Sequence, residues 1–303
     1  MSTTTTYAPA FDLDSVPEED RDRVAAMIPN PAVADAYIHR TVEGMNDFDL
    51  FDIALEEIEN IILEGPTGSS KTSAFKAYAA ARGLPFVVVE CNGAMDPGMI
   101  IGKTTTLGDG SLGWVDGELP LAIRHGGVVL FDEVNMAIPR IMAAFKMLIS
   151  VTRQMSVPEN AETIKANPVL LIAAAYNNRY QGTSRLNEAL LNQFAIPLDW
   201  GYERNVEEQL CDSTRLLDFA DNARSLATIR TAVSTNMLIE FERHARRMGM
   251  RLAMRLFLNH FPDEERGPVA RALGAHSAAI ADELGVDDID ITVFAEASDD
   301  TSE

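Results

Sequence analysis

The sequence has little cysteine, few aromatic residues and no long apolar run. Only two of its 303 residues are cysteines, Cys91 and Cys211, which are too few for a disulfide framework and are expected to be buried small apolar residues. No window approaches the roughly 18 unbroken apolar residues that a membrane helix needs. The first residues, MSTTTTYAPAFDLD, lack the basic region and apolar core of a secretory signal. We therefore expect a cytoplasmic protein without a membrane span.

Basic residues are also scarce, because 46 Asp and Glu outnumber 25 Lys and Arg and give a formal net charge of −21. The acidic excess is concentrated at the two ends. Residues 282–303 hold nine acidic residues and no basic one, and residues 1–20 hold five and none. Such segments are usually solvated. We expect a flexible acidic N-terminus over residues 1–21 and an acidic tail over residues 285–303, and the overall charge argues against nucleic-acid binding.

Between these ends, apolar runs that predict strands alternate with patterns that predict helices. The predicted strands are 61–63, 86–90, 128–131, 169–174 and a short edge strand at 195–198. The predicted helices are 18–27, 32–44, 49–60, 73–82, 137–150 and 185–193. Nearly continuous apolar strands separated by helices indicate a parallel sheet that is covered on both faces. We therefore expect an α/β domain over residues 22–201.

The strand pattern stops after about residue 202, and only helical patterns follow. Helices are predicted over residues 206–219, 235–248 and 268–284. The chain is therefore expected to continue with a small all-helical domain over residues 202–284, before the acidic tail begins.

Residues 65–72 read GPTGSSKT and lie between a predicted strand and a predicted helix. This order is typical of a phosphate-binding loop, in which backbone N–H groups and a helix N-terminus converge on an anion. Lys71 is expected to reach the terminal phosphates of ATP, and Thr72 to ligate Mg²⁺. Ser70 departs from the usual pattern, which has glycine there, and a positive φ would cost serine about 1 kcal/mol. The predicted binding residues are Gly65, Pro66, Thr67, Gly68, Ser69, Ser70, Lys71 and Thr72.

Two further predicted strands end in polar side chains. The run VVLFDE, residues 128–133, ends in two adjacent carboxylates, which a buried strand rarely carries unless a cation is bound nearby. We expect Asp132 to hold the water shell of Mg²⁺ and Glu133 to polarise the attacking water. A strand that simply enters an acidic loop is the alternative. The run LLIAAAYNN ends near Asn177, whose amide can bond the γ-phosphate or that water.

Together these segments resemble an AAA+ ATPase, and more narrowly the MoxR branch with its NorQ- and CbbQ-like members. The most specific match is WVDGELPLAIRHGGVVLFDEVN, residues 114–135, and the resemblance covers roughly residues 50–260. It implies a three-layer P-loop α/β domain followed by a small helical lid. It also implies a hexameric ring that holds ATP and Mg²⁺ between subunits. The partner it implies is a protein client, often one with a von Willebrand A-type domain.

Two positions depart from the pattern of that family. The segment 182–194 usually ends in Arg-Phe, and that arginine serves the ATP of the neighbouring subunit, but this chain has Gln193. The second motif, sensor 2, usually reads Ser-Thr-Arg, and here its last residue is Asn236. Glutamine cannot neutralise developing phosphate charge as a guanidinium does. Arg179 and Arg185 lie nearby, and Arg185 is the candidate replacement. The candidate catalytic residues are Lys71, Glu133, Asn177 and Arg185.

Five arginines cluster in the predicted helical domain of this otherwise acidic chain: Arg243, Arg246, Arg247, Arg251 and Arg255. Such a cluster can bind nucleic acid, but it is also expected on a solvated helix face that pairs with an acidic stretch of a neighbour. The five histidines are scattered and make no metal-binding spacing. Residues 92–113 and a hairpin around 151–165 are candidate client contacts, or alternatively packing surfaces within a ring.

The leading hypothesis is a Mg²⁺-dependent ATPase ring that remodels or activates a protein partner. The alternative is a nucleotide-gated assembly or interaction module with weak or no turnover, and Ser70, Gln193 and Asn236 motivate it. A nucleic-acid motor is a third hypothesis, which depends on the arginine cluster alone. Glu133 favours the first hypothesis, because a chain that only bound nucleotide would not need a carboxylate to polarise water.

Overall fold

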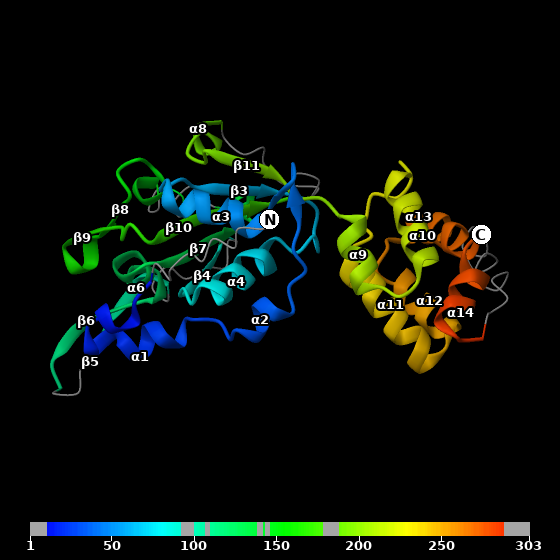
Figure 1. The fold of residues 1–303 in the computed structure, drawn as a ribbon, viewed down its shortest axis with the longest axis horizontal. Coiled ribbons are helices and arrows are strands. Elements are labelled where there is room, and N and C mark those ends of the chain that lie inside the picture. The colour runs from blue at the N-terminus through cyan, green and yellow to red at the C-terminus, as the bar shows by residue number, and fades with distance from the viewer. Residues whose placement is uncertain are drawn as a thin grey trace, which may run out of the picture. The chain divides into compact units, whose positions relative to one another are not determined.

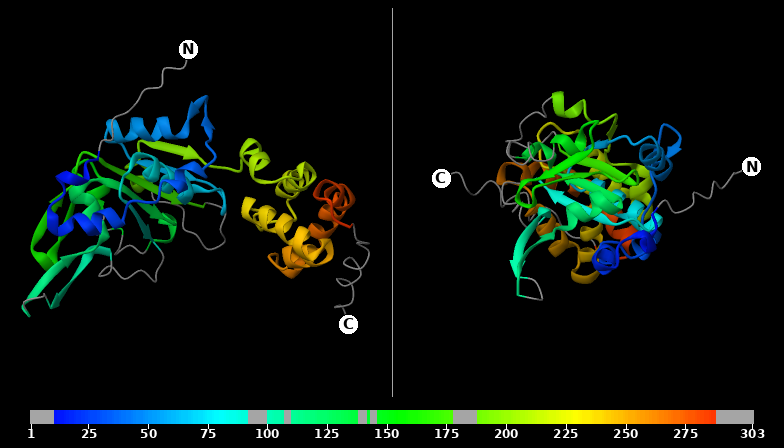
Figure 2. Two further views of the ribbon diagram at one scale, coloured as in Figure 1. Left: turned by 60° about the horizontal axis from the view of Figure 1, so that its bottom comes forward. Right: turned by 90° about the vertical axis from the view of Figure 1, so that its left-hand side faces the viewer.

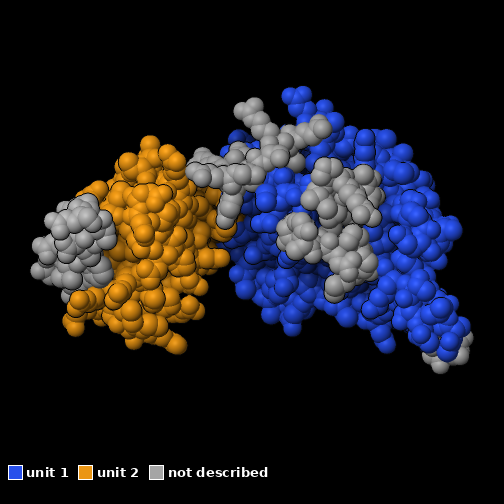
Figure 3. All heavy atoms as spheres, turned by 180° about the vertical axis from the view of Figure 1, so that it is seen from behind, with its two compact units in different colours: residues 1–65, 70–200 blue, residues 66–69, 201–303 orange. Residues whose placement is uncertain are grey.

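The computed structural model describes residues 11–91, 100–106, 110–137, 142, 146–177 and 188–287. The chain divides into two compact units, which Figure 3 distinguishes by colour. The first unit consists of the residues up to Gly65 together with Ser70–Trp200, and the second of Pro66–Ser69 together with the residues from Gly201 onward. Within the described part of the chain, no helix is both long and apolar enough to cross a membrane.

The first unit is built on a five-stranded sheet with the order β11-β3-β10-β7-β4 (Figure 1). All of its strand pairs are parallel. The central strand, β10, is buried at each of its seven positions, as expected for a sheet covered on both faces. The predicted parallel sheet is therefore confirmed. Its strands are β3 (Ile61–Glu64), β4 (Phe86–Glu90), β7 (Gly127–Asp132), β10 (Leu170–Tyr176) and β11 (Ile196–Asp199).

Alternate residues along the inner strands β3, β10 and β7 point to two separate apolar cores, because side chains in a strand alternate between the two faces. Val129 and Phe131 of β7 pack into a core that includes residues of α6 (Glu118–His125). Val128 and Leu130 pack into a core with residues of α3 (Asp47–Glu56) and α4 (Lys71–Arg82). The unit therefore has the three-layer arrangement of helices, sheet and helices that the sequence predicted.

Three antiparallel strand pairs accompany the sheet among the residues that the structure describes. They are β1 (Thr41–Val42) with β2 (Met45–Asn46), β5 (Gly102–Thr106) with β6 (Leu112–Asp116), and β8 (Gln154–Val157) with β9 (Glu162–Lys165). The last pair confirms the hairpin predicted around residues 151–165. The first pair shows that the helix predicted over residues 32–44 is too long, since α2 spans only Ala32–Asp35. Glu43 and Gly44 both have positive φ, which suits a two-residue hairpin turn.

The N-terminal residues from Phe11 onward pack against the first unit. Phe11 and Val16 are 9% and 2% exposed, and both belong to the core that α3 and α4 share. A short 3₁₀ turn (Leu13–Ser15) and α1 (Glu18–Ala26) follow. The expectation of a flexible segment is therefore corrected for residues 11–21, where two apolar side chains hold the chain in place. Residues 1–10 and 288–303 lie outside the described residues.

The second unit is helical between residues 204 and 284 (Figure 2). Its core gathers apolar side chains from the five helices between residues 214 and 284, including Leu216, Leu238, Phe241 and Phe257. The predicted helix 235–248 matches α11, whereas the one predicted over 206–219 is two helices, because Ser213 caps a new N-terminus there. The helices are α9 (Arg204–Leu210), α10 (Thr214–Ser225), α11 (Thr235–Met248), α12 (Met250–Leu258), α13 (Asp263–Gly274) and α14 (Ser277–Leu284).

Candidate functional site

The predicted phosphate loop connects the end of β3 to the start of α4, which begins at Lys71. Ser70 precedes that helix with φ 65° and ψ 25°, in the left-handed region, and its side chain makes no capping hydrogen bond. The serine thus occupies a conformation that favours glycine. The hydroxyl of Ser69 donates to the carbonyl of Pro66 at 2.9 Å, which braces the turn.

Lys71 lies folded back on the loop, where its Nζ donates to the carbonyl oxygen of Gly65 at 2.8 Å. Burial lowers the pKa of Lys71 to about 8, while the nearby carboxylate of Asp132 opposes that shift and Arg40 adds to it. The lysine is therefore still mainly protonated at neutral pH. Arg40 is a residue that sequence reasoning missed: it is buried, and its guanidinium lies 4.7 Å from the ring centre of Trp200.

Thr72 and Asp132 come together although 60 residues separate them in the chain. The Thr72 hydroxyl donates to Oδ2 of Asp132 at 2.6 Å, and the backbone N–H of Glu133 donates to Oδ1 at 2.9 Å. A hydroxyl beside a carboxylate is a donor set that fits Mg²⁺. No group of three or more His, Cys, Asp or Glu side chains forms a metal cage among the described residues. A Mg²⁺ ion here would therefore depend on phosphate oxygens and water for its other ligands.

Glu133 follows the last residue of β7 and is exposed, with φ 53°. A left-handed glutamate costs about 1 kcal/mol or more, and such strain often accompanies function. Two residues further on, Nδ2 of Asn135 donates to the carbonyl oxygen of Asn177 at 2.9 Å. This bond joins the segment after β7 to the end of β10. Sequence reasoning missed Asn135, although an amide so close to a carboxylate pair is a signal that could have been used.

The predicted arginine substitutes are not placed by the structure. Arg185 and Arg179 fall on residues 178–187, which lie outside the described residues. Gln193 follows α8 (Glu188–Leu191), and its side-chain Nε2 lies 3.4 Å from the carbonyl oxygen of Ala189. Asn236 is exposed in the first turn of α11.

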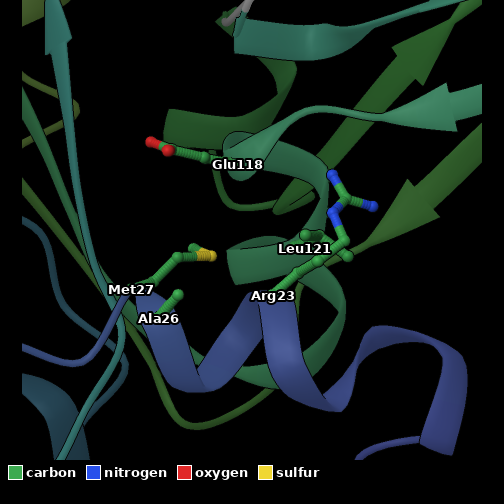
Figure 4. A pocket seen from close by; sticks show the side chains of 5 residues that line it. All are labelled: Arg23, Ala26, Met27, Glu118 and Leu121. Atoms are coloured by element: carbon green, nitrogen blue, oxygen red, sulfur yellow. The ribbon is translucent and has the colours of Figure 1, made fainter.

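Two pockets in the first unit contain no residue of the predicted site. One, of about 250 Å³, lies between α1 and α6 and is lined by Arg23, Ala26, Met27, Glu118 and Leu121 (Figure 4). The other, of about 220 Å³, lies at the carboxyl ends of β3, β10 and β11. There the Tyr176 hydroxyl donates to Glu64, and burial together with that carboxylate raises the pKa of the tyrosine.

A single family model covers the phosphate loop together with β7 and β10, the two strands that end in the polar residues of the predicted site. Residues 60–194 match the AAA domain of the dynein-related subfamily. The five-stranded parallel sheet is that of a P-loop AAA+ domain, and a helical C-terminal region follows it.

Similar chains were found among curated proteins and solved structures. An uncharacterized protein of Staphylococcus haemolyticus is 36% identical over 142 residues, which cover 46% of this chain and 54% of that protein. One from Staphylococcus aureus is 34% identical over 151 residues, covering 48% and 56%. The chain thus spans about half the length of these curated relatives. The crystal structure of NtrX from Brucella abortus in complex with ADP has 16% identity and a TM-score of 0.42, covering 88% of this chain and 70% of that one.

Proposed function

We propose that this protein is an ATP-hydrolysing AAA+ ring protein, similar to the MoxR branch, that remodels or activates a protein partner. The observation that carries the proposal is the hydrogen bond between Thr72 and Asp132, near the half-buried Lys71. These groups and Glu133 lie at the carboxyl ends of parallel strands, the edge at which α/β sheets bind ligands. The groups to which we assign phosphate binding, metal binding and water activation thus lie at one edge of the sheet.

Each group has a proposed role in hydrolysis. Backbone N–H groups of residues 65–72 hold the phosphates, and Lys71 balances their charge. Thr72 and, through water, Asp132 would hold Mg²⁺, which would supply further neutralisation of the phosphate oxygens. Glu133 takes a proton from water as that water bonds to the γ-phosphorus and the bond to the β–γ bridging oxygen breaks. Asn177 orients the same water, and ADP and inorganic phosphate leave.

We further propose a hexameric ring in the cytoplasm, with a client that carries a von Willebrand A-type domain. Two buried free cysteines, Cys91 and Cys211, support a reducing compartment. In a ring, an arginine of one subunit would complete the site of the next, and Arg185 is the candidate. Arg185→Ala should lower turnover by about 10³-fold or more without loss of ATP binding, whereas Arg179→Ala should not.

A second candidate function is a nucleotide-gated assembly module with weak or no turnover. The left-handed Ser70, together with Gln193 and Asn236 at positions where the family has arginines, favours it. Loss of an arginine that acts across subunits can reduce phosphoryl transfer by about 10³- to 10⁵-fold. The two candidates therefore differ in turnover and agree on nucleotide binding.

Two variants test the proposal. Lys71→Ala should abolish ATP binding, and Glu133→Gln should retain binding while turnover falls by about 10²- to 10⁴-fold. Lys76→Ala on the exposed face of α4 and Glu159→Gln in an exposed turn are the matched controls. If the parent binds ATP and does not hydrolyse it, the second candidate is correct. If Lys71→Ala and Glu133→Gln both hydrolyse ATP like the parent, the assignment of the site is wrong.

The Glu133→Gln variant also tests the ring and the client. With ATP bound and not cleaved, the assembly should persist long enough to be weighed by light scattering and used to capture a partner. A mass near six protomers supports the hexamer, and a protomer mass at saturating ATP contradicts it.

A further inference from the structure

Three arginines on α11 and α12 stand apart from the proposed nucleotide chemistry. Arg247, Arg251 and Arg255 are exposed, and within residues 188–287 and the other described ranges their guanidinium groups have no hydrogen bond or ion pair. The two neighbouring arginines are different. Arg243 lies 3.7 Å from a carboxylate of Glu240, and Arg246 lies 2.6 Å from one of Asp212.

Two exposed apolar residues are sequence neighbours of the three unpaired arginines. Met248 and Leu252 are 49% and 42% exposed, and we call Arg247, Met248, Arg251, Leu252 and Arg255 the basic patch. Gly249, with φ 82°, separates α11 from α12, and the two helices pack side by side (Figure 2). Residues 243–262 contain five arginines and no acidic residue, in a chain whose net charge is −21. The patch is thus a local concentration of positive charge with an apolar component.

We propose that the basic patch binds the acidic C-terminal segment, residues 287–303, of the same chain. Residues 285–303 contain seven acidic residues and no basic one, so their charge is opposite to that of the patch. They also contain the apolar residues Ile289, Ile291, Val293 and Phe294, which suit the exposed Met248 and Leu252. The acidic residues of the segment therefore match the arginines of the patch, and its apolar residues match the exposed apolar residues of the patch.

The segment starts close enough to reach the patch. Ile280 and Leu284 of α14 pack in the same core as Leu238 and Phe241 of α11, and the described chain ends at Asp287. The 16 residues that follow could extend about 50 Å, whereas α11, with 14 residues, is about 21 Å long. Tethering also gives the segment an effective concentration on the order of millimolar. A weak, charge-driven contact would therefore be well populated within one chain.

A nucleic acid is the other polyanion that such a patch could bind, but the charges favour the tail. The whole chain carries −21, which repels a phosphate backbone at long range. The tail is attached, so it competes with any free polyanion for the same arginines.

The rotational mobility of a fluorophore attached to the C-terminal segment tests the proposal in the full chain. Ser302→Cys provides one reactive thiol, because both native cysteines are buried. At low salt a fluorophore on that thiol should tumble slowly, with the second unit. At 1 M salt, where charges are screened beyond about 3 Å, the slow part of the anisotropy decay should fall by about two-fold or more. The triple variant with Arg247→Gln, Arg251→Gln and Arg255→Gln should already give the released value at low salt.

Two control chains separate docking from general charge and folding effects. Replacing Arg215, Arg230 and Arg271 with Gln removes three exposed arginines of the same unit and should leave the tail docked. Asp288→Asn, Asp290→Asn, Asp299→Asn and Asp300→Asn should release the tail from an unaltered patch.

Three results would overturn the proposal. Equal label mobility in the parent and the patch variant at low salt would show that the patch does not hold the tail. Slow tumbling that appears only as protein concentration rises would make the tail of a second copy the occupant. A single strand of about 20 nucleotides that binds the parent but not the patch variant, while the tail moves freely, would assign the patch to nucleic acid.

Discussion

Ser70 and Gly83 adopt nearly the same left-handed conformation at the two ends of α4. Their φ and ψ angles are 65° and 25° for Ser70, and 62° and 28° for Gly83. Neither position gains from a side chain, since the Ser70 side chain makes no capping hydrogen bond and a Cβ added at Gly83 would meet no atom within 4 Å. Removing the Ser70 side chain should therefore stabilise the protein, and adding one at Gly83 should destabilise it.

The two opposing contributions give the expected size of the effect. In the left-handed region, a residue with a Cβ destabilises the folded state by about 1–2 kcal/mol relative to glycine. Glycine in turn lowers stability by about 0.4–1 kcal/mol, because it gives the unfolded chain more entropy. Ser70→Gly should therefore raise the free energy of unfolding of the first unit by about 0.5–1 kcal/mol, and Gly83→Ser should lower it by about the same amount.

Thermal unfolding without nucleotide measures this difference. For a domain of about 150–250 residues, 1 kcal/mol shifts Tm by about 2–4 °C, so each variant should shift Tm by about 1–4 °C, in opposite directions. Ser70→Ala keeps the Cβ and should match the parent within about 1 °C. The double variant should also be close to the parent, because the two sites are about 20 Å apart along the helix and should act additively. A fall in Tm for both Ser70→Gly and Ser70→Ala would refute the strain argument, and would mean that the serine hydroxyl stabilises the loop.

Three other perturbations have defined outcomes. Thr72→Ala removes the hydroxyl that donates to Asp132, so calorimetry should find about ten-fold weaker ATP binding with Mg²⁺ and little change in EDTA, while Thr72→Ser should resemble the parent. Asn135→Leu breaks the link to the end of β10 and should lower kcat by about ten-fold with ADP affinity retained; equal loss of both would indicate misfolding. The third perturbation concerns Glu283. Burial alone would raise its pKa, but hydrogen bonds from the start of α10 hold that pKa below its usual value. The ionised Glu283 therefore stabilises the fold above its unfolded pKa, and this stabilisation is lost as pH falls through its folded pKa. Glu283→Gln should lower Tm at pH 7. The difference in Tm between the variant and the parent should shrink below pH about 4.5 and should not shrink in the alkaline range.

Much of the first unit could be predicted from apolar runs. The sequence between residues 127 and 132 is apolar up to its final aspartate, and such a short run with two valines favours a strand covered on both faces. The place of each strand in the sheet was beyond such reasoning, because runs of similar composition do not distinguish β10, at the centre, from β4, at an edge. The edge position of β11 was predictable, since Pro197 cannot donate a ladder hydrogen bond.

The residues of the candidate site that belong to sequence motifs were predictable, and those that tertiary packing brings to the site were not. Thr72 and Asp132 each follow a recognisable pattern, and in the structure a hydrogen bond joins their side chains. Arg40 has no local signal, because it lies in the irregular segment just before β1 and becomes buried only through tertiary packing. The turn at Glu43 and Gly44 was missed because the helical pattern before it extends across a glycine.

The position of β3 in the sheet governs when the phosphate loop can acquire its support during synthesis. Its two neighbours are β10 and β11, which begin at Leu170 and Ile196, more than 100 residues after Ile61. The pair β4 and β7 can form much sooner, since it needs the chain only as far as Asp132. As the chain leaves the ribosome, β3 therefore stays unpaired until these later strands are made. This strand, which precedes the phosphate loop, is among the last of the sheet to form its hydrogen bonds.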